Sequence, residues 1–416
     1  MTVSHDQFLA DFAELSAIGA TGRGGVDRQA ATAADAAARR WLAGLLAANG
    51  FEVVYDRVGN QFGLRGWVPD APAVLVGSHL DSQPTAGRFD GAYGVLAAAH
   101  AAFAVSESIA TGRLTPRLNL AVVNWFNEEG SRFQPSMMGS ACYTRAMAPA
   151  AALATQDRAG QTVAEALAAQ GMLGDWDGPE AACAAEIHVE QGRELEDTGY
   201  PIGLVTSAWA ARKYSIEITG EQAHSGSAIM ADRRDALYGA ALVTVAIRAL
   251  ADASNGKLHS GIGQMEVYPN SPVVVASRVK LLADLRSADV ELLNRAAAEL
   301  EERLAEAGKQ ARVRVDAQLT HAWDMEPYAP GGVELARRCA DRLGLRHRPI
   351  LTIAGHDSTN LKRMVPTVML FVPSAQGVSH SEAEFTGDAD LLAGLDLLTE
   401  VVGELIGGAA GDLPPS

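Results

Sequence analysis

Short hydrophobic segments alternate with Ala- and Leu-rich segments along the first half of the chain. Residues 51–56, 73–77 and 119–126 contain β-branched and aromatic side chains, and turn-forming residues bound them, which predicts strands. The first 50 residues predict helix, most clearly at 30–48, and a further helix is expected at 94–104. This alternation predicts a mixed or parallel sheet with helices on both faces. In such a sheet, the side chains that carry chemistry lie just past the carboxyl ends of the strands.

The middle of the chain has a different pattern. Strand, helix, strand, strand, helix and strand are predicted in turn, which is the order of a ferredoxin-like fold. These elements are expected at 213–219, 232–252, 261–268, 273–285, 289–307 and 312–319. Strands of the first sheet are then expected to resume at 351–353 and 367–372. Residues 411–416 are expected to fray.

The chain has 416 residues, a length that suits two or three domains. We predict one α/β domain built from residues 1–207 and 321–416. A smaller α+β domain, residues 208–320, is predicted to interrupt it.

The overall charge narrows the class of protein. The chain has 34 Lys and Arg against 50 Asp and Glu, so its net charge is −16. Such a charge disfavours binding to nucleic acid or to anionic lipid. We see no uninterrupted apolar run approaching the ~20 residues of a membrane helix, and no signal peptide at the N-terminus. Three scattered cysteines are too few for a disulfide framework, so we expect a cytoplasmic enzyme.

The densest chemical signal is Gly77-Ser78-His79-Leu80-Asp81. His79 and Asp81 project to the same face of an extended strand, and a carboxylate beside a histidine commonly orients the ring for metal binding. Asp90 follows in a glycine-flanked loop that could return to the same point. The alternative is a histidine at a strand end with two solvated aspartates.

Two adjacent glutamates, Glu128 and Glu129, follow the apolar segment 119–126. They point in different directions, so one could bind a metal ion while the other moves a proton. The alternative is a solvated acidic turn, but this position is where an α/β sheet places its functional site.

Two more histidines complete a ligand set. His188 alternates with Glu186 and Glu190, whose carboxylates are expected on its face, and His380 follows the strand at 367–372. The combined set provides nitrogen and oxygen ligands without cysteine, which suits Zn²⁺, Mn²⁺, Co²⁺ or Ni²⁺. Its members are His79, Asp90, Glu129, His188 and His380. Five ligands with one bridging carboxylate would form a two-metal hydrolytic site.

Three residues are candidates for binding substrate. His224 and His356 lie in glycine-rich settings and could hold a carbonyl group. Arg286 could bind a carboxylate through two parallel hydrogen bonds. A surface salt bridge from Arg286 to Asp284 or Asp289 is the alternative.

The ordered motifs resemble the metallopeptidase family of carboxypeptidase G2-like peptidases and aminoacylases. They are more similar to its hydantoinase/carbamoylase branch, which includes N-carbamoyl-L-amino acid amidohydrolases, β-ureidopropionases and allantoate amidohydrolases. His188 is the feature that marks this branch. The motifs span nearly the whole chain and read GSHLDSQPTAGRFDGAYGVLAA, NEEGSRF, HVEQG, TGEQAHSG, AGHDS and GVSHSEAEF.

The resemblance implies a homodimer whose zinc-peptidase-like catalytic domain is interrupted by a small lid and dimerisation domain. It implies two divalent metal ions bridged by Asp90, with His79 and either His380 or His188 on separate ions. Glu129 would be a further ligand and Glu128 the general base. Substrate contacts are implied for Gln191, His224, Arg286 and His356.

The implied reaction is hydrolysis of a linear amide or ureido bond, with an N-carbamoyl amino acid or related ureido acid as the substrate. One departure concerns that substrate: Val273 stands where relatives usually have asparagine. Losing such a polar contact changes substrate discrimination. The alternatives are an aminoacylase or dipeptidase of the same family, and a non-catalytic binding protein that retains the fold.

Overall fold

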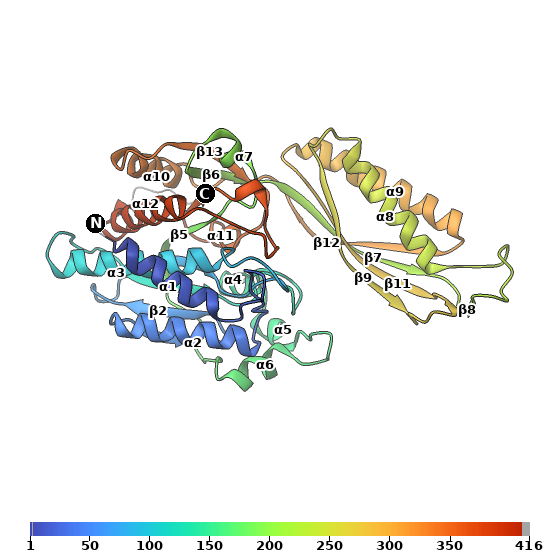
Figure 1. The fold of residues 1–416 in the computed structure, drawn as a ribbon, viewed down its shortest axis with the longest axis horizontal. Coiled ribbons are helices and arrows are strands. Elements are labelled where there is room, and N and C mark those ends of the chain that lie inside the picture. The colour runs from blue at the N-terminus through green and yellow to red at the C-terminus, as the bar shows by residue number, and fades with distance from the viewer. Residues whose placement is uncertain (2, 410–416) are drawn as a thin grey trace. The chain divides into compact units, whose positions relative to one another are not determined.

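The computed structural model describes residues 1 and 3–409, so the predicted frayed end at 411–416 lies outside the described residues. The chain divides into two compact units, one formed by Met1–Ser207 with Pro327–Ser416 and the other by Ala208–Glu326 (Figure 1). The second unit ends six residues beyond the predicted boundary at 320. Strand β12 (Arg314–Trp323) accounts for this difference, because it continues past the predicted strand at 312–319.

The first unit is built on an eight-stranded mixed sheet in the order β1-β2-β4-β3-β5-β14-β6-β13. Strands β4, β3, β5 and β14 are neighbours and run parallel to one another, whereas β1, β2 and β6 pair antiparallel. The strands are β1 (Glu52–Tyr55), β2 (Gln61–Arg65), β3 (Ala73–His79), β4 (Asn119–Trp125), β5 (Ala181–Val189), β6 (Ile202–Ala208), β13 (His347–Thr352) and β14 (Thr367–Val372).

Helices cover this sheet; the sequence predicted α2 and α3 approximately, but it did not predict α10 or α12. The predicted helical N-terminus is two helices separated by an irregular segment, because Ile18 ends the first helix in an extended conformation. The helices of this unit are α1 (His5–Ala17), α2 (Ala33–Ala48), α3 (Ala92–Ala110), α4 (Met138–Tyr143), α5 (Pro149–Ala154), α6 (Val163–Gln170), α7 (Glu194–Thr198), α10 (Pro330–Arg342), α11 (Asp357–Leu361) and α12 (Asp388–Ile406), with the 3₁₀ turn η1 (Ala375–Gly377).

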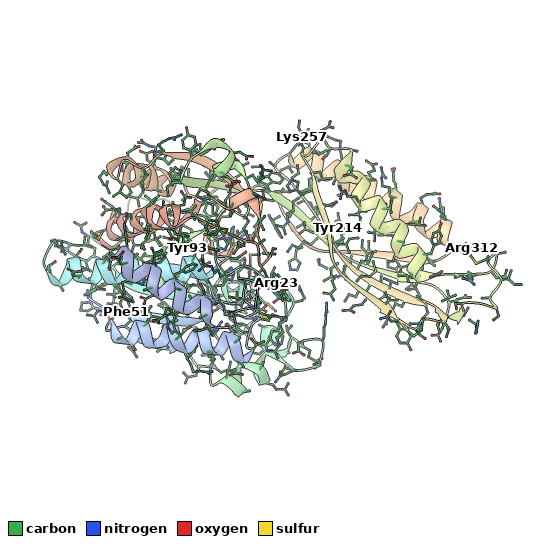
Figure 2. The ribbon with its side chains drawn as sticks, viewed as in Figure 1. Arg23, Phe51, Tyr93, Tyr214, Lys257 and Arg312 are labelled. Atoms are coloured by element: carbon green, nitrogen blue, oxygen red, sulfur yellow. The ribbon has the colours of Figure 1, made fainter. Side chains whose placement is uncertain are left out.

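Both faces of the sheet are buried, as the continuous apolar strands predict. Val74 and Val76 of β3 face the main core, which includes Phe51, Tyr93 and side chains from α3 and α12 (Figure 2). Leu75, between the two valines, faces a smaller core on the opposite side of the sheet. Because successive side chains of a strand point to opposite faces of the sheet, β3 packs against a hydrophobic core on each face.

Helix α3 is long and rich in apolar residues, although His100 and Glu107 interrupt its apolar run. Among the described residues it is the one helix long and apolar enough to cross a membrane. Most of it is buried inside the protein, where it packs against α12 and the central strands. Its composition is therefore that of a core helix.

The second unit has a four-stranded antiparallel sheet in the order β12-β7-β11-β9 with two long helices, α8 and α9. This is the predicted strand and helix order, with two differences: the predicted strand at 273–285 is broken into β10 and β11, and the short strand β8 was not predicted. Two short strands, β8 and β10, pair separately from the main sheet. The elements are β7 (Ala210–Thr219), β8 (Ala223–His224), α8 (Ala236–Asp252), β9 (His259–Tyr268), β10 (Val274–Val275), β11 (Arg278–Ser287), α9 (Val290–Ala311) and β12.

Leu96 of α3 tests the packing that supports the sheet, because its side chain is fully buried in the main core. Leu96→Ala should lower the free energy of unfolding by about 2–5 kcal/mol, from lost burial and the cavity left behind. Urea denaturation followed by circular dichroism measures this change. Leu343→Ala, at a side chain that is 39% exposed, is the control and should cost much less. Equal losses for the two variants would contradict the packing role of α3.

Candidate metal centre

The candidate ligands meet because four parallel strands end at one edge of the sheet. His79 is the last residue of β3, and it lies beside Trp125, the last residue of β4. His188 of β5 lies beside Phe371 of β14. The loops that leave β4 and β14 at this edge carry Glu128 with Glu129 and His380, respectively.

Three buried residues, His79, Asp90 and His188, form a first group that could hold a metal ion. Nε2 of His79 lies 3.4 Å and Nε2 of His188 lies 3.1 Å from Oδ1 of Asp90. One ligand atom from each residue lies within 4.8 Å of the others. Two imidazole nitrogens and one carboxylate oxygen are a suitable partial ligand set for Zn²⁺ and similar ions.

A second group consists of Asp90, Glu129 and His380. Nε2 of His380 lies 3.3 Å from Oδ2 of Asp90 and 3.4 Å from Oε2 of Glu129. Asp90 is therefore common to both groups, and its two oxygens face different histidines. The structure groups His188 with His79, and His380 with Glu129, a division that the sequence left open.

The hydrogen bonds of two histidines leave Nε2 as the basic nitrogen. Nδ1 of His79 lies 2.9 Å from the carbonyl oxygen of Asp81, and Nδ1 of His188 lies 2.8 Å from that of Val189. A carbonyl oxygen only accepts, so Nδ1 carries the hydrogen in both rings. Nε2 of His188 accordingly accepts from the backbone N–H of Gly91 at 2.9 Å. This tautomer is the one that a metal ligand at Nε2 requires.

Asp81 supports the site differently from what the sequence suggested. Its backbone carbonyl group, rather than its carboxylate, accepts from His79, and the nearer carboxylate oxygen lies 3.9 Å from Nδ1. The carboxylate instead accepts from the backbone N–H groups of Glu128 (3.1 Å) and Glu129 (3.3 Å). Asp81 thus holds the turn that presents both glutamates.

The carboxylates predicted beside His188 also bind elsewhere. Glu186 accepts from the Ser78 hydroxyl at 2.8 Å and from the backbone N–H of Ser358 at 2.9 Å, which links β5 to β3 and α11. Glu190 accepts from the backbone N–H groups of Glu194 and Leu195 at the start of α7. Both residues stabilise the strands and loops around the site.

Glu128 is buried next to the first group without being part of it. Its Oε2 atom lies 3.7 Å from Nε2 of His79. Burial raises the pKa of Glu128 well above its usual range, with only partial compensation from His79 and with a further increase from the charges of Asp357 and Glu129. A buried carboxyl group with a raised pKa is suited to accept and return a proton.

Two supporting residues, Gln83 and Glu384, were not identified from the sequence. The backbone N–H and side-chain amide of Gln83 donate to the carboxylate of Glu129 at 3.1 and 2.9 Å. Glu384 accepts from the backbone N–H of Asp90 at 3.1 Å, and burial together with the charge of Asp90 raises its pKa to about 7. Glu384 lies within the GVSHSEAEF motif, but only the folded chain brings it to the loop of Asp90.

The residue after Asp90 must be a glycine, because its backbone lies against the ring of His79. Gly91 has φ = +63°, and a Cβ atom there would lie 2.4 Å from the ring of His79. Any larger residue would displace the ring or the loop. This explains why a glycine follows Asp90.

The site gathers several carboxyl groups in a buried place. Asp81, Asp90, Glu128 and Asp357 are all buried carboxyl groups. Burial opposes ionisation of Asp90, but the charge of the protonated form of His188 and the hydrogen bonds from His188, His380 and His79 hold the pKa of Asp90 well below its usual range. Burial and the charge of Glu186 raise the pKa of Asp357 well above the usual range of an aspartate. Buried carboxylates in such number favour binding of cations.

Two candidate substrate residues of the first unit lie against the ligands. Nε2 of Gln191 donates to Oδ2 of Asp90 at 2.6 Å. The ring of His356 packs on that of His188 with centroids 4.5 Å apart. Both residues are therefore close enough to the ligand cluster to meet a molecule bound there.

The other two candidates, His224 and Arg286, lie on the second unit. Nδ1 of His224 accepts from the backbone N–H groups of Gly226 and Ser227 at 3.0 and 3.1 Å, and the side chain is exposed. Arg286 forms hydrogen bonds to both carboxylate oxygens of Asp284, the shortest 2.8 Å long, which is the salt bridge considered as an alternative.

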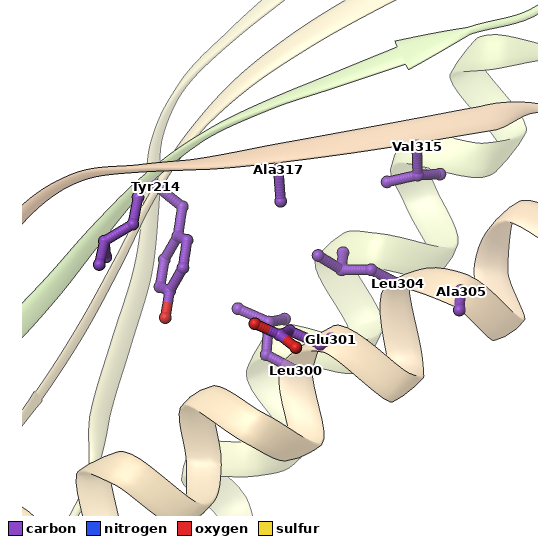
Figure 3. Close-up of a pocket in the computed structure, with 8 residues that line it drawn as sticks. Tyr214, Leu300, Glu301, Leu304, Ala305, Val315 and Ala317 are labelled. Carbon is purple, nitrogen blue, oxygen red and sulfur yellow. The ribbon is translucent and has the colours of Figure 1, made fainter.

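The second unit also contains a pocket of about 310 Å³ beside α9, β7 and β12 (Figure 3). Its lining combines aliphatic side chains with polar groups that include the Tyr214 hydroxyl and the Glu301 carboxylate. It lacks the histidines and grouped carboxylates of the candidate metal centre. The lining residues are Tyr214, Leu300, Glu301, Leu304, Ala305, Val315, Ala317 and Leu319.

Comparisons with known proteins show the family of the chain. Residues 75–404 match the model of Peptidase family M20/M25/M40. A putative hydrolase of Mycolicibacterium smegmatis is 53% identical over 409 residues, which cover 97% of this chain and 93% of that protein. An N-carbamoyl-L-amino-acid amidohydrolase of Rhizobium meliloti is 32% identical, with 96% of each chain covered.

A crystal structure of an amidase of the hydantoinase/carbamoylase family from Burkholderia vietnamiensis superposes with a TM-score of 0.92. It is 36% identical to this chain, and the match covers 97% of this chain and 98% of that one. The chain therefore belongs to Peptidase family M20/M25/M40, in its hydantoinase/carbamoylase branch.

Proposed function

We propose that this protein is a binuclear metal-dependent amidohydrolase that cleaves the linear ureido bond of an N-carbamoyl amino acid or related ureido acid. The observation that carries the proposal is the sharing of Asp90 between two groups of metal-binding side chains. The likeness to an N-carbamoyl-L-amino-acid amidohydrolase supports the choice of substrate class.

His79, Asp90 and His188 would hold one divalent ion, and Asp90, Glu129 and His380 the other. The chemistry of these residues fits Zn²⁺, Mn²⁺, Co²⁺ or Ni²⁺: the donors are nitrogen and oxygen, and two of the imidazoles have Nδ1 engaged with carbonyl oxygens. When bound, the ions would polarise the carbonyl group of the substrate and lower the pKa of water.

Glu128 would act as the general base and then as the general acid. Its carboxylate would take a proton from the attacking water molecule and deliver it to the leaving nitrogen of the ureido group. Burial next to His79 keeps the carboxyl group away from bulk solvent, so the proton stays available for the second step. With an N-carbamoyl amino acid, the products would be the free amino acid, ammonia and CO₂.

Gln191 and His356 would contact the substrate next to the metal ligands. His224 would stabilise the oxyanion. Arg286 would bind the substrate carboxylate through two hydrogen bonds, as it now binds the carboxylate of Asp284. For these last two residues the support is the family resemblance.

A homodimer is part of the proposal. Several large apolar side chains are exposed on α8 and β9 of the second unit: Tyr238, Val245, Met265 and Tyr268. Tyr238 and Val245, seven positions apart on α8, share one face of that helix, and neighbouring exposed apolar side chains favour a protein interface. A second copy of this chain is the partner that the family resemblance supports.

The identity of the products tests the proposed reaction. Protein reconstituted with Mn²⁺, Zn²⁺, Co²⁺ or Ni²⁺ should release ammonia from N-carbamoyl amino acids, because hydrolysis frees the amino acid and a carbamate that decomposes to ammonia and CO₂. Release of acyl acids or of amino acids from N-acyl amino acids or dipeptides, without ammonia, would instead identify an aminoacylase or dipeptidase. No turnover of any of these compounds would indicate a binding protein.

Glu128→Gln should reduce kcat by 10²-fold or more, because the amide keeps the size of the side chain but accepts no proton. Metal content, measured by mass spectrometry of the elements, should stay near that of the wild type. Glu129→Gln is the matched comparison and should lose metal. If Glu128→Gln loses metal and recovers activity at high metal concentration, the roles of the two glutamates are reversed.

His224→Ala and Glu128→Gln chains, when mixed, test whether the site is shared across the dimer. Each variant alone should be nearly inactive. If the lid of one subunit serves its partner, half of the dimers in an equal mixture have one intact site of two, so activity should recover to about a quarter of the wild-type value. No recovery, with heterodimers detected by native mass spectrometry, would mean that His224 serves its own subunit or none.

A further inference from the structure

Glu384 is a buried residue that the proposed chemistry does not use. Its Oε2 atom accepts from the backbone N–H groups of Phe89 (2.9 Å) and Asp90 (3.1 Å). Only 5% of the residue is exposed. A single carboxylate oxygen therefore holds the backbone of the loop that carries Asp90.

The other oxygen of Glu384 reaches the side chain of Asp90 through Ser379. Oε1 of Glu384 lies 3.0 Å from the Ser379 hydroxyl, which lies 2.9 Å from Oδ2 of Asp90. The Gln191 amide closes the network, with Nε2 2.6 Å from Oδ2 of Asp90 and 3.2 Å from the Ser379 hydroxyl. Both the backbone and the carboxylate of Asp90 are thus connected to Glu384.

The loop is shaped to admit the Glu384 side chain. A Cβ atom at Gly87 would lie 2.0 Å from Oε2 of Glu384, so a glycine there permits the close approach. The segments GRFDG and SHSEAEF are far apart in sequence. They pack together because the Glu384 carboxylate of the second occupies the space that a side chain at Gly87 of the first would fill. This fit is independent of the hydrogen bonds.

We propose that Glu384 is a positioning residue for the metal pair, which fixes Asp90 so that its two oxygens face the two ligand groups. This inference rests on the proposed role of Asp90 as the bridging ligand. Oδ1 of Asp90 faces His79 and His188, and Oδ2 faces His380. A bridging carboxylate needs this orientation before the ions bind, and residues that orient metal ligands typically change metal affinity by 10–100-fold.

Two substitutions separate this role from simple loop packing. Glu384→Ala removes both acceptor oxygens. Glu384→Gln keeps one oxygen for the two N–H groups and provides an amide donor for Ser379. Glu382→Gln is the matched control, because Glu382 is in the same loop and pairs with the exposed Arg23.

The experiment measures binding of Mn²⁺ to the metal-free full-length protein by calorimetry, and the visible absorption spectrum after loading with Co²⁺. Glu384→Ala should weaken Mn²⁺ binding by at least about tenfold and change the Co²⁺ spectrum, which reports ligand geometry. Glu384→Gln should stay within about threefold of the wild type, and Glu382→Gln should match it.

Ser379→Ala provides a second test that leaves the backbone hydrogen bonds of Glu384 in place, so it applies even if Glu384→Ala does not fold. Ser379→Ala should weaken Mn²⁺ binding less than Glu384→Ala does. Unchanged Mn²⁺ affinity and an unchanged Co²⁺ spectrum in Ser379→Ala, and in Glu384→Ala where that variant folds, would overturn the inference while the proposed function stands. If the wild type itself binds no ion, the proposed function fails, and the inference fails with it.

Discussion

The buried carboxylate of Asp90 lies among three imidazole rings, and much of the surrounding structure keeps it there. A carboxylate removed from water is stable only with hydrogen bonds or a nearby positive charge. In this protein His79, His188 and His380 face its two oxygens within 3.4 Å. The same surroundings that stabilise the anion therefore form two adjacent groups of ligands for cations.

The parallel strands make this convergence possible. Neighbouring parallel strands end at one edge of a sheet, so residues separated by more than a hundred positions in sequence, such as His79 and His188, arrive side by side. The core on both faces of the sheet holds the strands in register. Stability of the core and geometry of the site are thus linked through the strand ends.

Residues behind the ligands determine where each ligand points. The Asp81 carboxylate holds the Glu128–Glu129 turn, Gln83 holds the Glu129 side chain, and backbone carbonyl groups select the tautomers of two histidines. These contacts leave Glu128 near His79 but outside both ligand groups. Adjacent residues with the same chemistry can then take different roles, one as a ligand and the other as a base.

The sequence by itself predicted the alternation of strands and helices near the N-terminus, the strand and helix order of the second unit and the identity of the side chains that gather at Asp90, because hydrophobic periodicity and strand-end position are local properties. It did not show that the second unit extends to Glu326, that 273–285 breaks into two strands, or that Asp81 binds His79 through its backbone. Nor did it reveal Gln83 and Glu384, or the division of the histidines between two groups. These features depend on which atoms meet across distant segments, and only the packed tertiary structure decides that.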